Sequence, residues 1–246
     1  MRWLLLRGLA REQRHWGGFP AVFEARVPGS SVVCLDLPGA GTEHLRASPD
    51  RIEAIADDLR ARWLALGAAG GEPWGLLAMS LGGMVAMAWA DAHPGDFERV
   101  VLASTSAAGL SPPWRRFGLG VLPGVLRAFS AQDAERREAL ILGLTTRRVA
   151  DVAAVARDWA ALGASRPMRR ANVVRQLRAA ARFRAPARLA VPTLVLAGDG
   201  DRLVDPSCSR VLAAHLGAPS SFHPEAGHEL ALDAPDWLCD QIAAWR

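Results

Sequence analysis

The sequence predicts an α/β fold, in which a mostly parallel sheet has helices on both faces and one helical segment is inserted between two strands. Short apolar runs alternate along the chain with amphipathic helical patterns, which is typical of parallel strands buried between helices. The alternation stops near residue 110 and resumes near residue 187. Half of the 246 residues are apolar, enough for one large core.

The first half of the chain supplies four of the expected strands. These strands are expected at residues 3–6, 31–35, 74–79 and 99–103. Apolar residues spaced three and four apart predict a helix that begins near Pro49 and continues to Trp63. A second helix, rich in small residues, is expected over residues 82–92. Strand and helix therefore alternate from the start of the chain.

The second half completes the sheet after an interruption. The expected elements are a strand at residues 193–197, a helix at 206–216, a short strand just before His228 and a helix at 235–245. Between the two halves the pattern is helical, with prolines and glycines as interruptions. We therefore expect an α/β core formed by residues 1–109 and 187–246, with residues 110–186 inserted as a helical cap.

Composition excludes several classes of protein. The three cysteines are widely separated and form no Cys-x-x-Cys pair, so neither a disulfide framework nor a zinc site is indicated, and a cytoplasmic location is expected. The first residues contain too few apolar positions for a secretory signal, and glycines divide the longest uncharged stretch, residues 73–90, so we expect no membrane span. All 29 basic residues are arginine in a chain of net charge +4. We attribute this to compositional bias and expect no nucleic-acid partner.

A serine lies between a predicted strand and a predicted helix. The sequence around it is Ala78-Met79-Ser80-Leu81-Gly82-Gly83. A nucleophile elbow needs small residues on both sides of the serine, because strand and helix approach closely at the strained turn that exposes the hydroxyl. A serine that only caps the helix is the alternative. The position between strand and helix favours Ser80 as a nucleophile.

A nucleophilic serine needs a base, and the base needs an acid that orients it. The strand at 193–197 ends in a cluster of aspartates, of which Asp201 is our first choice because it lies far enough beyond the strand to reach back over the sheet. Asp199 is the second choice, and Asp205 is expected to cap the next helix. His228 is expected as the base, on a loop before the last helix. His223 competes with it, but it falls within the probable last strand.

Two backbone N–H groups are expected to stabilise the negatively charged oxygen of a tetrahedral intermediate. One donor should be Leu81, directly after the nucleophile. The other should be Leu9, on the loop after the first strand, where Gly8 allows a close approach.

The order of these motifs resembles that of the α/β-hydrolase superfamily. The matching segments are Leu6-Arg7-Gly8, residues 36–41, residues 79–83, residues 198–201 and Gly227-His228. They cover nearly the whole chain except the cap. The chain is similar to the small capped serine esterases, including the carboxylesterase that releases pimeloyl carrier protein from its methyl ester. The resemblance implies no metal and no organic cofactor, and a serine at residue 80 argues against the dehalogenase and epoxide-hydrolase branches.

The chain departs from this family in two respects. Family members usually have histidine before the oxyanion glycine, where this chain has Arg7, so the hydrogen bonding of that loop is expected to differ. The chain also begins at what would be the third strand of a full-length member, which implies a sheet shortened at its N-terminal side.

Charge is concentrated in the expected cap. Between residues 110 and 189 there are 16 arginines and five acidic residues, an excess of 16 − 5 = 11 positive charges. This excess could dock an acidic acyl carrier protein, a coenzyme A thioester or an anionic headgroup, or it could be the solvated surface of an arginine-rich protein. The apolar side chains there are expected either to line an acyl pocket or to pack against the core. They are Trp114, Phe117, Leu119, Val121, Leu122, Leu126 and Phe129.

The leading hypothesis is hydrolysis of a carboxylic ester of a small molecule through an acyl-serine intermediate. A thioesterase that acts on acyl carrier protein or acyl coenzyme A would use the same residues. A noncatalytic binding protein on a hydrolase scaffold is the remote alternative, because a fold does not fix a function.

Overall fold

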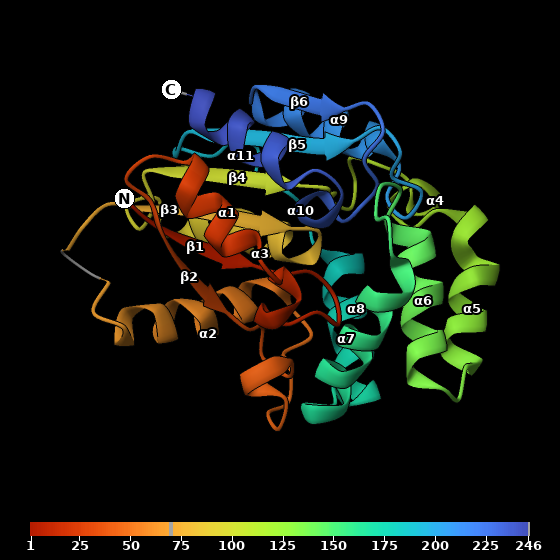
Figure 1. Ribbon diagram of the computed structural model, residues 1–246. Helices are drawn as coiled ribbons and strands as arrows, with labels where there is room; N and C mark the ends of the chain where they lie inside the picture. The colour runs from red at the N-terminus through yellow and green to blue at the C-terminus, as the bar shows by residue number, and fades with distance from the viewer. Residues whose placement is uncertain (69–70, 246) are drawn as a thin grey trace.

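The computed structural model describes residues 1–68 and 71–245 and contains one central sheet (Figure 1). Its strands are β1 (Arg2–Leu6), β2 (Ser31–Leu35), β3 (Trp74–Met79), β4 (Arg99–Ala103), β5 (Thr193–Gly198) and β6 (Ser220–His223). They lie in the order β2-β1-β3-β4-β5-β6, and each neighbouring pair is parallel. The predicted α/β fold is therefore confirmed. Arg246, the last residue of the expected core, lies outside the described residues.

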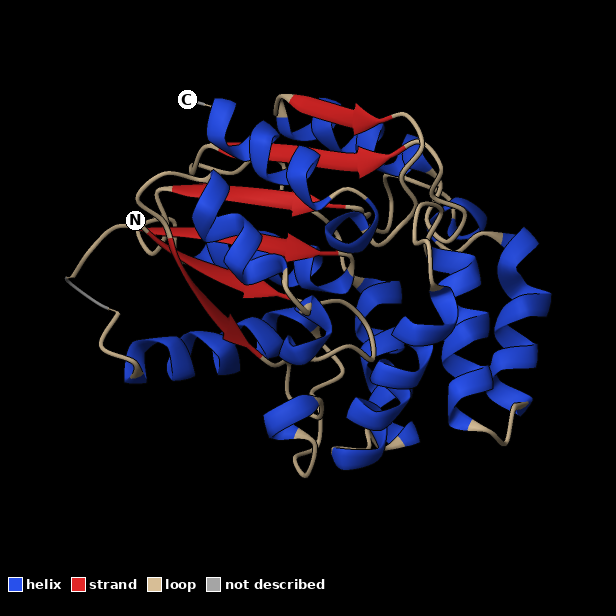
Figure 2. Cartoon of the chain, in the orientation of Figure 1, coloured by secondary structure: helices blue, strands red, loops and turns tan. Residues whose placement is uncertain are grey.

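Helices cover both faces of the sheet (Figure 2). They are α1 (Phe19–Arg26), α2 (Ile52–Ala65), α3 (Leu81–Ala92), α4 (Pro113–Arg116), α5 (Leu122–Ser130), α6 (Ala134–Thr145), α7 (Val152–Ser165), α8 (Arg170–Arg182), α9 (Pro206–Leu216), α10 (Leu230–Asp233) and α11 (Pro235–Ala244). The helix predicted from Pro49 begins at Ile52, because Arg51 is still extended with φ −133°. In the part of the chain that the structure describes, no helix is both long and apolar enough to span a membrane.

Alternation along the strands divides the core into two layers. In β1, Leu4 and Leu6 face a layer formed with α2, α3 and α9, whereas Trp3 and Leu5 face a layer formed with α1, α10 and α11. Side chains of successive strand residues point to opposite faces, so a strand that is apolar throughout is buried on both. Packing explains why residue 75 in β3 is glycine, because a Cβ at this position would lie 2.7 Å from the ring of Trp3.

Residues 110–186, which we call the cap segment, lie between β4 and β5 and contain α4 to α8. No strand occurs in this range, all of which the structure describes. The cap segment is fastened to the core through Asn172 of α8. Its buried amide donates to the carbonyls of Gly39 (3.3 Å) and Arg46 (2.9 Å) and accepts from the N–H of Ser48 (3.0 Å). The exact limits of the inserted unit stay a prediction.

Most of the apolar side chains named above do not have the packing role expected of them. Five of the seven are exposed: Trp114 58%, Leu119 67%, Leu122 42%, Leu126 61% and Phe129 59%. These five side chains do not pack against the core, whereas Val121 is buried and Phe117 is half-buried. The reason is the position of α5, which packs on α6 through its opposite side, where Ala128 is buried, and forms the outer edge of the molecule (Figure 1).

Candidate active site

Ser80 lies in the turn between β3 and α3. Its backbone has φ 54° and ψ −119°, a conformation that costs energy for any residue with a side chain. The turn is held from two sides, because the Ser80 N–H donates to the carbonyl of Ala103 (2.9 Å) and the Thr105 hydroxyl donates to the carbonyl of Ser80 (2.7 Å). This is the geometry of a nucleophile elbow.

Two glycines allow the elbow to form. A Cβ at Gly82 would lie 2.6 Å from the carbonyl oxygen of Arg7, so only glycine lets α3 approach the end of β1. A Cβ at Gly8 would lie 2.9 Å from the Cβ of Ser80. The loop after β1 is therefore packed directly against the serine, as the sequence predicts.

The structure brings His228 and Asp201 together. Nδ1 of His228 lies 2.7 Å from Oδ2 of Asp201, and both residues are buried. Because a carboxylate accepts hydrogen bonds, Nδ1 is the donor and Nε2 is left with its lone pair. Oδ1 of Asp201 accepts from the N–H groups of Leu203 (2.8 Å) and Val204 (2.9 Å), which fix the carboxylate. No hydrogen bond joins Ser80 to His228, although the structure describes both residues fully; such bonds often tighten only when substrate binds.

The environment of His228 raises its pKa above the ordinary value for histidine. Burial acts in the opposite direction and lowers the pKa, but attraction from Asp201, the hydrogen bond to Asp201 and attraction from Glu229 together outweigh it. Arg7 is close enough to lower the pKa again in part. The surroundings therefore favour the imidazolium, the form that the histidine takes once it has accepted a proton.

The competing residues have other partners. Asp199 forms an ion pair with Arg210 at the surface, and Asp205 caps α9 by accepting from the N–H of Ser207, as the sequence predicts. Nδ1 of His223 accepts from the N–H groups of Glu225 (3.1 Å) and Ala226 (3.0 Å). Of the candidate acids and bases, Asp201 and His228 are the pair that the structure joins.

The two expected oxyanion donors have no protein acceptor. Leu81 is the first residue of α3, and Leu9 follows Gly8 on the loop packed against Ser80. Within residues 1–68 and 71–245, neither backbone N–H donates to a carbonyl or a side chain. Their role as oxyanion donors stays a prediction.

A buried ion pair beside the histidine was not predicted from the sequence. The Nη2 atom of Arg7 lies 2.7 Å from Oε2 of Glu229, the residue directly after His228. The same guanidinium lies over the ring of Trp16, 4.7 Å from its centroid, and Nη1 lies 3.6 Å from the sulfur of Met79. Arg7 therefore connects the oxyanion loop to the elements that hold the histidine and the serine.

A second buried arginine connects this region to the cap segment. Arg11 lies 2.8 Å from the carboxylate of Glu138 in α6, and its guanidinium is 4.3 Å from the ring centroid of Trp159 in α7. His15 packs edge-to-face with the same Trp159 ring. Burial and the neighbouring arginines lower the pKa of His15 to about 2. The wall between the core and the cap segment is thus built from arginine and aromatic rings.

Comparison with known proteins identifies the family. Residues 15–235 match the family described as Serine aminopeptidase, S33. No curated protein matches the chain in sequence.

Many solved structures share the fold. A thermophilic esterase from Thermogutta terrifontis has a TM-score of 0.75 at 22% identity, over 100% of this chain and 89% of that one. A hydrolase from Pseudomonas aeruginosa PA01 has a TM-score of 0.75 at 21% identity, over 98% and 88% of the two chains. The RedJ thioesterase from Streptomyces coelicolor has a TM-score of 0.66 at 16% identity, over 99% and 89%. At these identities the likeness shows the α/β-hydrolase fold alone.

Proposed function

The chain belongs to the family described as Serine aminopeptidase, S33, and we propose that it hydrolyses carboxylic esters through an acyl-serine intermediate. The observation that carries the proposal is the buried hydrogen bond between His228 and Asp201, at the edge of the sheet where Ser80 forms its strained turn. A histidine fixed through Nδ1 presents Nε2 as the base that a serine nucleophile needs.

The reaction has two halves that use the same groups. Nε2 of His228 takes the proton of the Ser80 hydroxyl while Oγ attacks the ester carbonyl, and the N–H groups of Leu9 and Leu81 stabilise the resulting oxyanion. The imidazolium returns its proton to the leaving alkoxide, and the alcohol departs. Water then attacks the acyl-serine with His228 as base, which releases the carboxylic acid and restores the Ser80 hydroxyl.

The carboxylates around the site favour an ester over a peptide with a free amino terminus. Recognition of an α-ammonium group needs an accessible negative charge. Glu229 is paired with Arg7, Glu138 with Arg11, and Glu12 with Arg14. Because these three carboxylates are paired with arginine, they are not free to bind a cationic amine, which favours an uncharged acyl group.

A thioester is the second candidate, because its hydrolysis uses the same serine, base and oxyanion donors. The observation that favours it is the positive charge of the cap segment, which suits the anionic groups of coenzyme A or of an acidic carrier protein. The RedJ thioesterase from Streptomyces coelicolor is a protein with the same fold.

The test is hydrolysis of p-nitrophenyl esters from acetate to decanoate, run beside an acyl coenzyme A and an amino-acid p-nitroanilide. We expect turnover of esters by the wild type, a loss of about 10⁴-fold or more in Ser80→Ala, and no loss in Ser220→Ala, which removes an exposed hydroxyl at the start of β6. Faster turnover of the thioester would favour the second candidate. Cleavage of the anilide in preference to both would contradict the proposal.

A further inference from the structure

The exposed side of the segment from Trp114 to Phe129 has an unusual composition. Ten large apolar side chains are exposed in the described part of the chain, and five of them lie in these 16 residues. Soluble proteins rarely expose apolar side chains in contiguous groups, and such groups mark interaction sites. We call the five residues, Trp114, Leu119, Leu122, Leu126 and Phe129, the outer apolar face.

Spacing places most of this face on one side of a helix. Leu119, Leu122, Leu126 and Phe129 follow one another at intervals of three, four and three residues, through a short 3₁₀ turn and into α5. The buried residues of the same stretch, Val121 and Ala128, lie on the opposite side and pack toward α6. The outer apolar face is therefore a stripe that no other part of the described chain covers.

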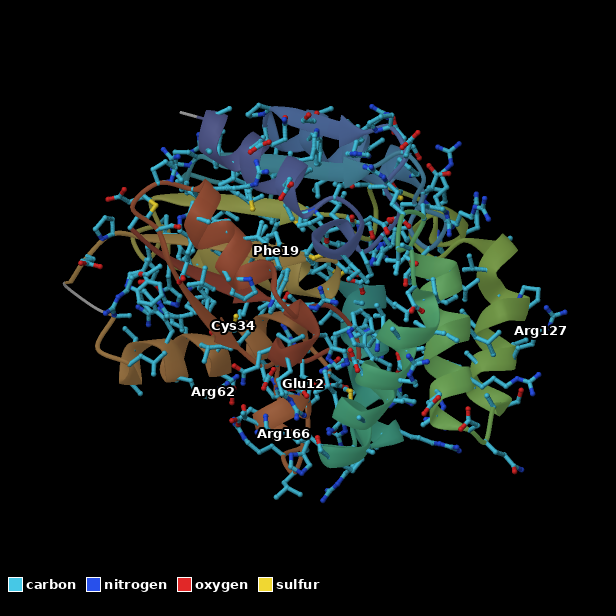
Figure 3. All side chains as sticks on the ribbon, viewed as in Figure 1. Glu12, Phe19, Cys34, Arg62, Arg127 and Arg166 are labelled. Carbon is cyan, nitrogen blue, oxygen red and sulfur yellow. The ribbon has the colours of Figure 1, made fainter. Side chains whose placement is uncertain are left out.

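The charged residues within the segment from Trp114 to Phe129 are all arginine. Between Glu98 and Asp133 the sequence contains no acidic residue and four arginines, of which Arg115, Arg116 and Arg127 lie in this segment. Arg115 and Arg127 are exposed and form no ion pair within the described residues, although Asp205 lies close to Arg115. Figure 3 shows Arg127 at the outer edge of α5. A helix with Leu and Phe on one side and arginine beside them, as in α5, is typical of a segment that lies in a membrane interface.

The stripe is joined to the loop that carries the predicted catalytic acid. The N–H of Gly118 donates to the carbonyl of Leu203 (2.9 Å), and the N–H of Asp205 donates to the carbonyl of Arg115 (2.9 Å). The N–H of Leu203 in turn donates to Asp201 (2.8 Å). One end of the outer apolar face is therefore connected to the candidate active site through this loop.

We propose that the outer apolar face, with Arg115 and Arg127, docks the chain onto the surface of a bilayer that contains anionic phospholipids. The apolar side chains enter the interface while the two guanidinium groups meet phosphate headgroups. A second copy of the chain is a poorer occupant, because a symmetric dimer would set each arginine against the same patch of its partner. That the ester substrate resides in the bilayer is a consequence that rests on the proposed function; the docking itself does not.

The proposal is tested by sedimentation with phosphatidylglycerol vesicles, and with phosphatidylcholine vesicles for comparison, so that no turnover is involved. We expect the wild type to bind phosphatidylglycerol more tightly, and added salt to weaken this binding. The double variant Leu126→Ser, Phe129→Ser should bind about tenfold more weakly or worse, because it withdraws two large apolar side chains from the interface. Arg127→Glu should weaken binding to phosphatidylglycerol and leave binding to phosphatidylcholine nearly unchanged.

A matched control is available on the core. Leu45 and Leu66 are 69% and 51% exposed, and the double variant Leu45→Ser, Leu66→Ser should bind like the wild type. Absence of binding to phosphatidylglycerol at low salt would overturn the proposal, as would equal losses in the two double variants. If the wild type instead forms dimers without lipid, and Leu126→Ser, Phe129→Ser makes them monomers, the face is an interface between copies and the proposal is wrong.

Discussion

Arginine is buried and paired beside the predicted base, whereas on the cap segment it is mostly exposed and unpaired. Arg7 and Arg11 are only 3% and 8% exposed, and each meets a carboxylate within 2.8 Å. From residue 159 to residue 198 the sequence holds eight arginines and no acidic residue, and among the described residues only Arg166 has an acidic neighbour, Glu12, at 3.8 Å. Figure 3 labels both residues in the lower half of the molecule.

This difference between buried and exposed arginines predicts where replacing an arginine should change stability or activity. A buried charge without a partner is costly, so Arg7 and Glu229 must be present together. An exposed arginine contributes little to stability and remains free to meet a ligand or a surface. Effects of mutation should therefore decrease steeply from the proposed triad and its buried neighbours to the outer side of the cap segment.

The largest effect is expected at Asp201. Asp201→Asn should lower kcat for the best p-nitrophenyl ester by about 10⁴-fold, because an amide in place of the carboxylate no longer fixes the productive tautomer of His228. Asp199→Asn is the matched control two residues away; it breaks only the surface pair with Arg210, and kcat should stay within about twofold. Equal effects of the two substitutions would refute the assignment of Asp201.

The next effect concerns stability. Arg7→Met should lower the free energy of unfolding by about 3–5 kcal/mol, measured by denaturant titration, because it leaves Glu229 buried without its partner. Adding Glu229→Gln should recover part of the loss. Arg178→Met, on the exposed side of α8, should change the same quantity by no more than about 0.5 kcal/mol. If Arg178→Met lowered the free energy of unfolding as much as Arg7→Met, the proposed difference between buried and exposed arginines would be wrong.

A smaller loss is expected where the cap segment is fastened to the core. Asn172→Ala removes three hydrogen bonds and leaves the buried N–H of Ser48 without a partner, which should cost about 1–3 kcal/mol of unfolding free energy. Val174→Ala in the same helix removes part of an exposed side chain and should cost about 0.5 kcal/mol or less. The account of this junction is wrong if the two variants unfold at the same denaturant concentration.

The smallest effect is a shift in the pH profile. The base must be neutral to act, so kcat/KM falls as the pH drops through the pKa of His228, which its surroundings raise. Asp201 and Glu229 favour the imidazolium and Arg7 opposes it, so Glu229→Gln should move the acid limb to lower pH. Glu225→Gln, at an exposed position paired with Arg148, should leave the limb in place. A shift to higher pH in Glu229→Gln would contradict this account of the electrostatics.

The features that could be predicted from the sequence are those encoded by residues close together in the chain. The strands and the turn at Ser80 are encoded by neighbouring residues, and small residues before and after the serine satisfy a steric requirement that the structure shows at Gly82. The pair of Arg7 and Glu229 joins positions 222 residues apart, and no local pattern reports such a contact. The exposure of the apolar residues of α5 could not be predicted, because helical spacing shows which residues share one side of a helix but not whether another element packs against that side.

The central claim is that Ser80 is the nucleophile activated by His228 and Asp201, and covalent labelling tests it most directly. The protein is treated with a fluorophosphonate, its intact mass is measured, and the modified peptide is sequenced. We predict one added phosphonyl group on Ser80 in the wild type and in Ser220→Ala, none in Ser80→Ala, and slow labelling in Asp201→Asn. A folded wild type that stays unmodified, or a label on any other residue, would contradict the claim.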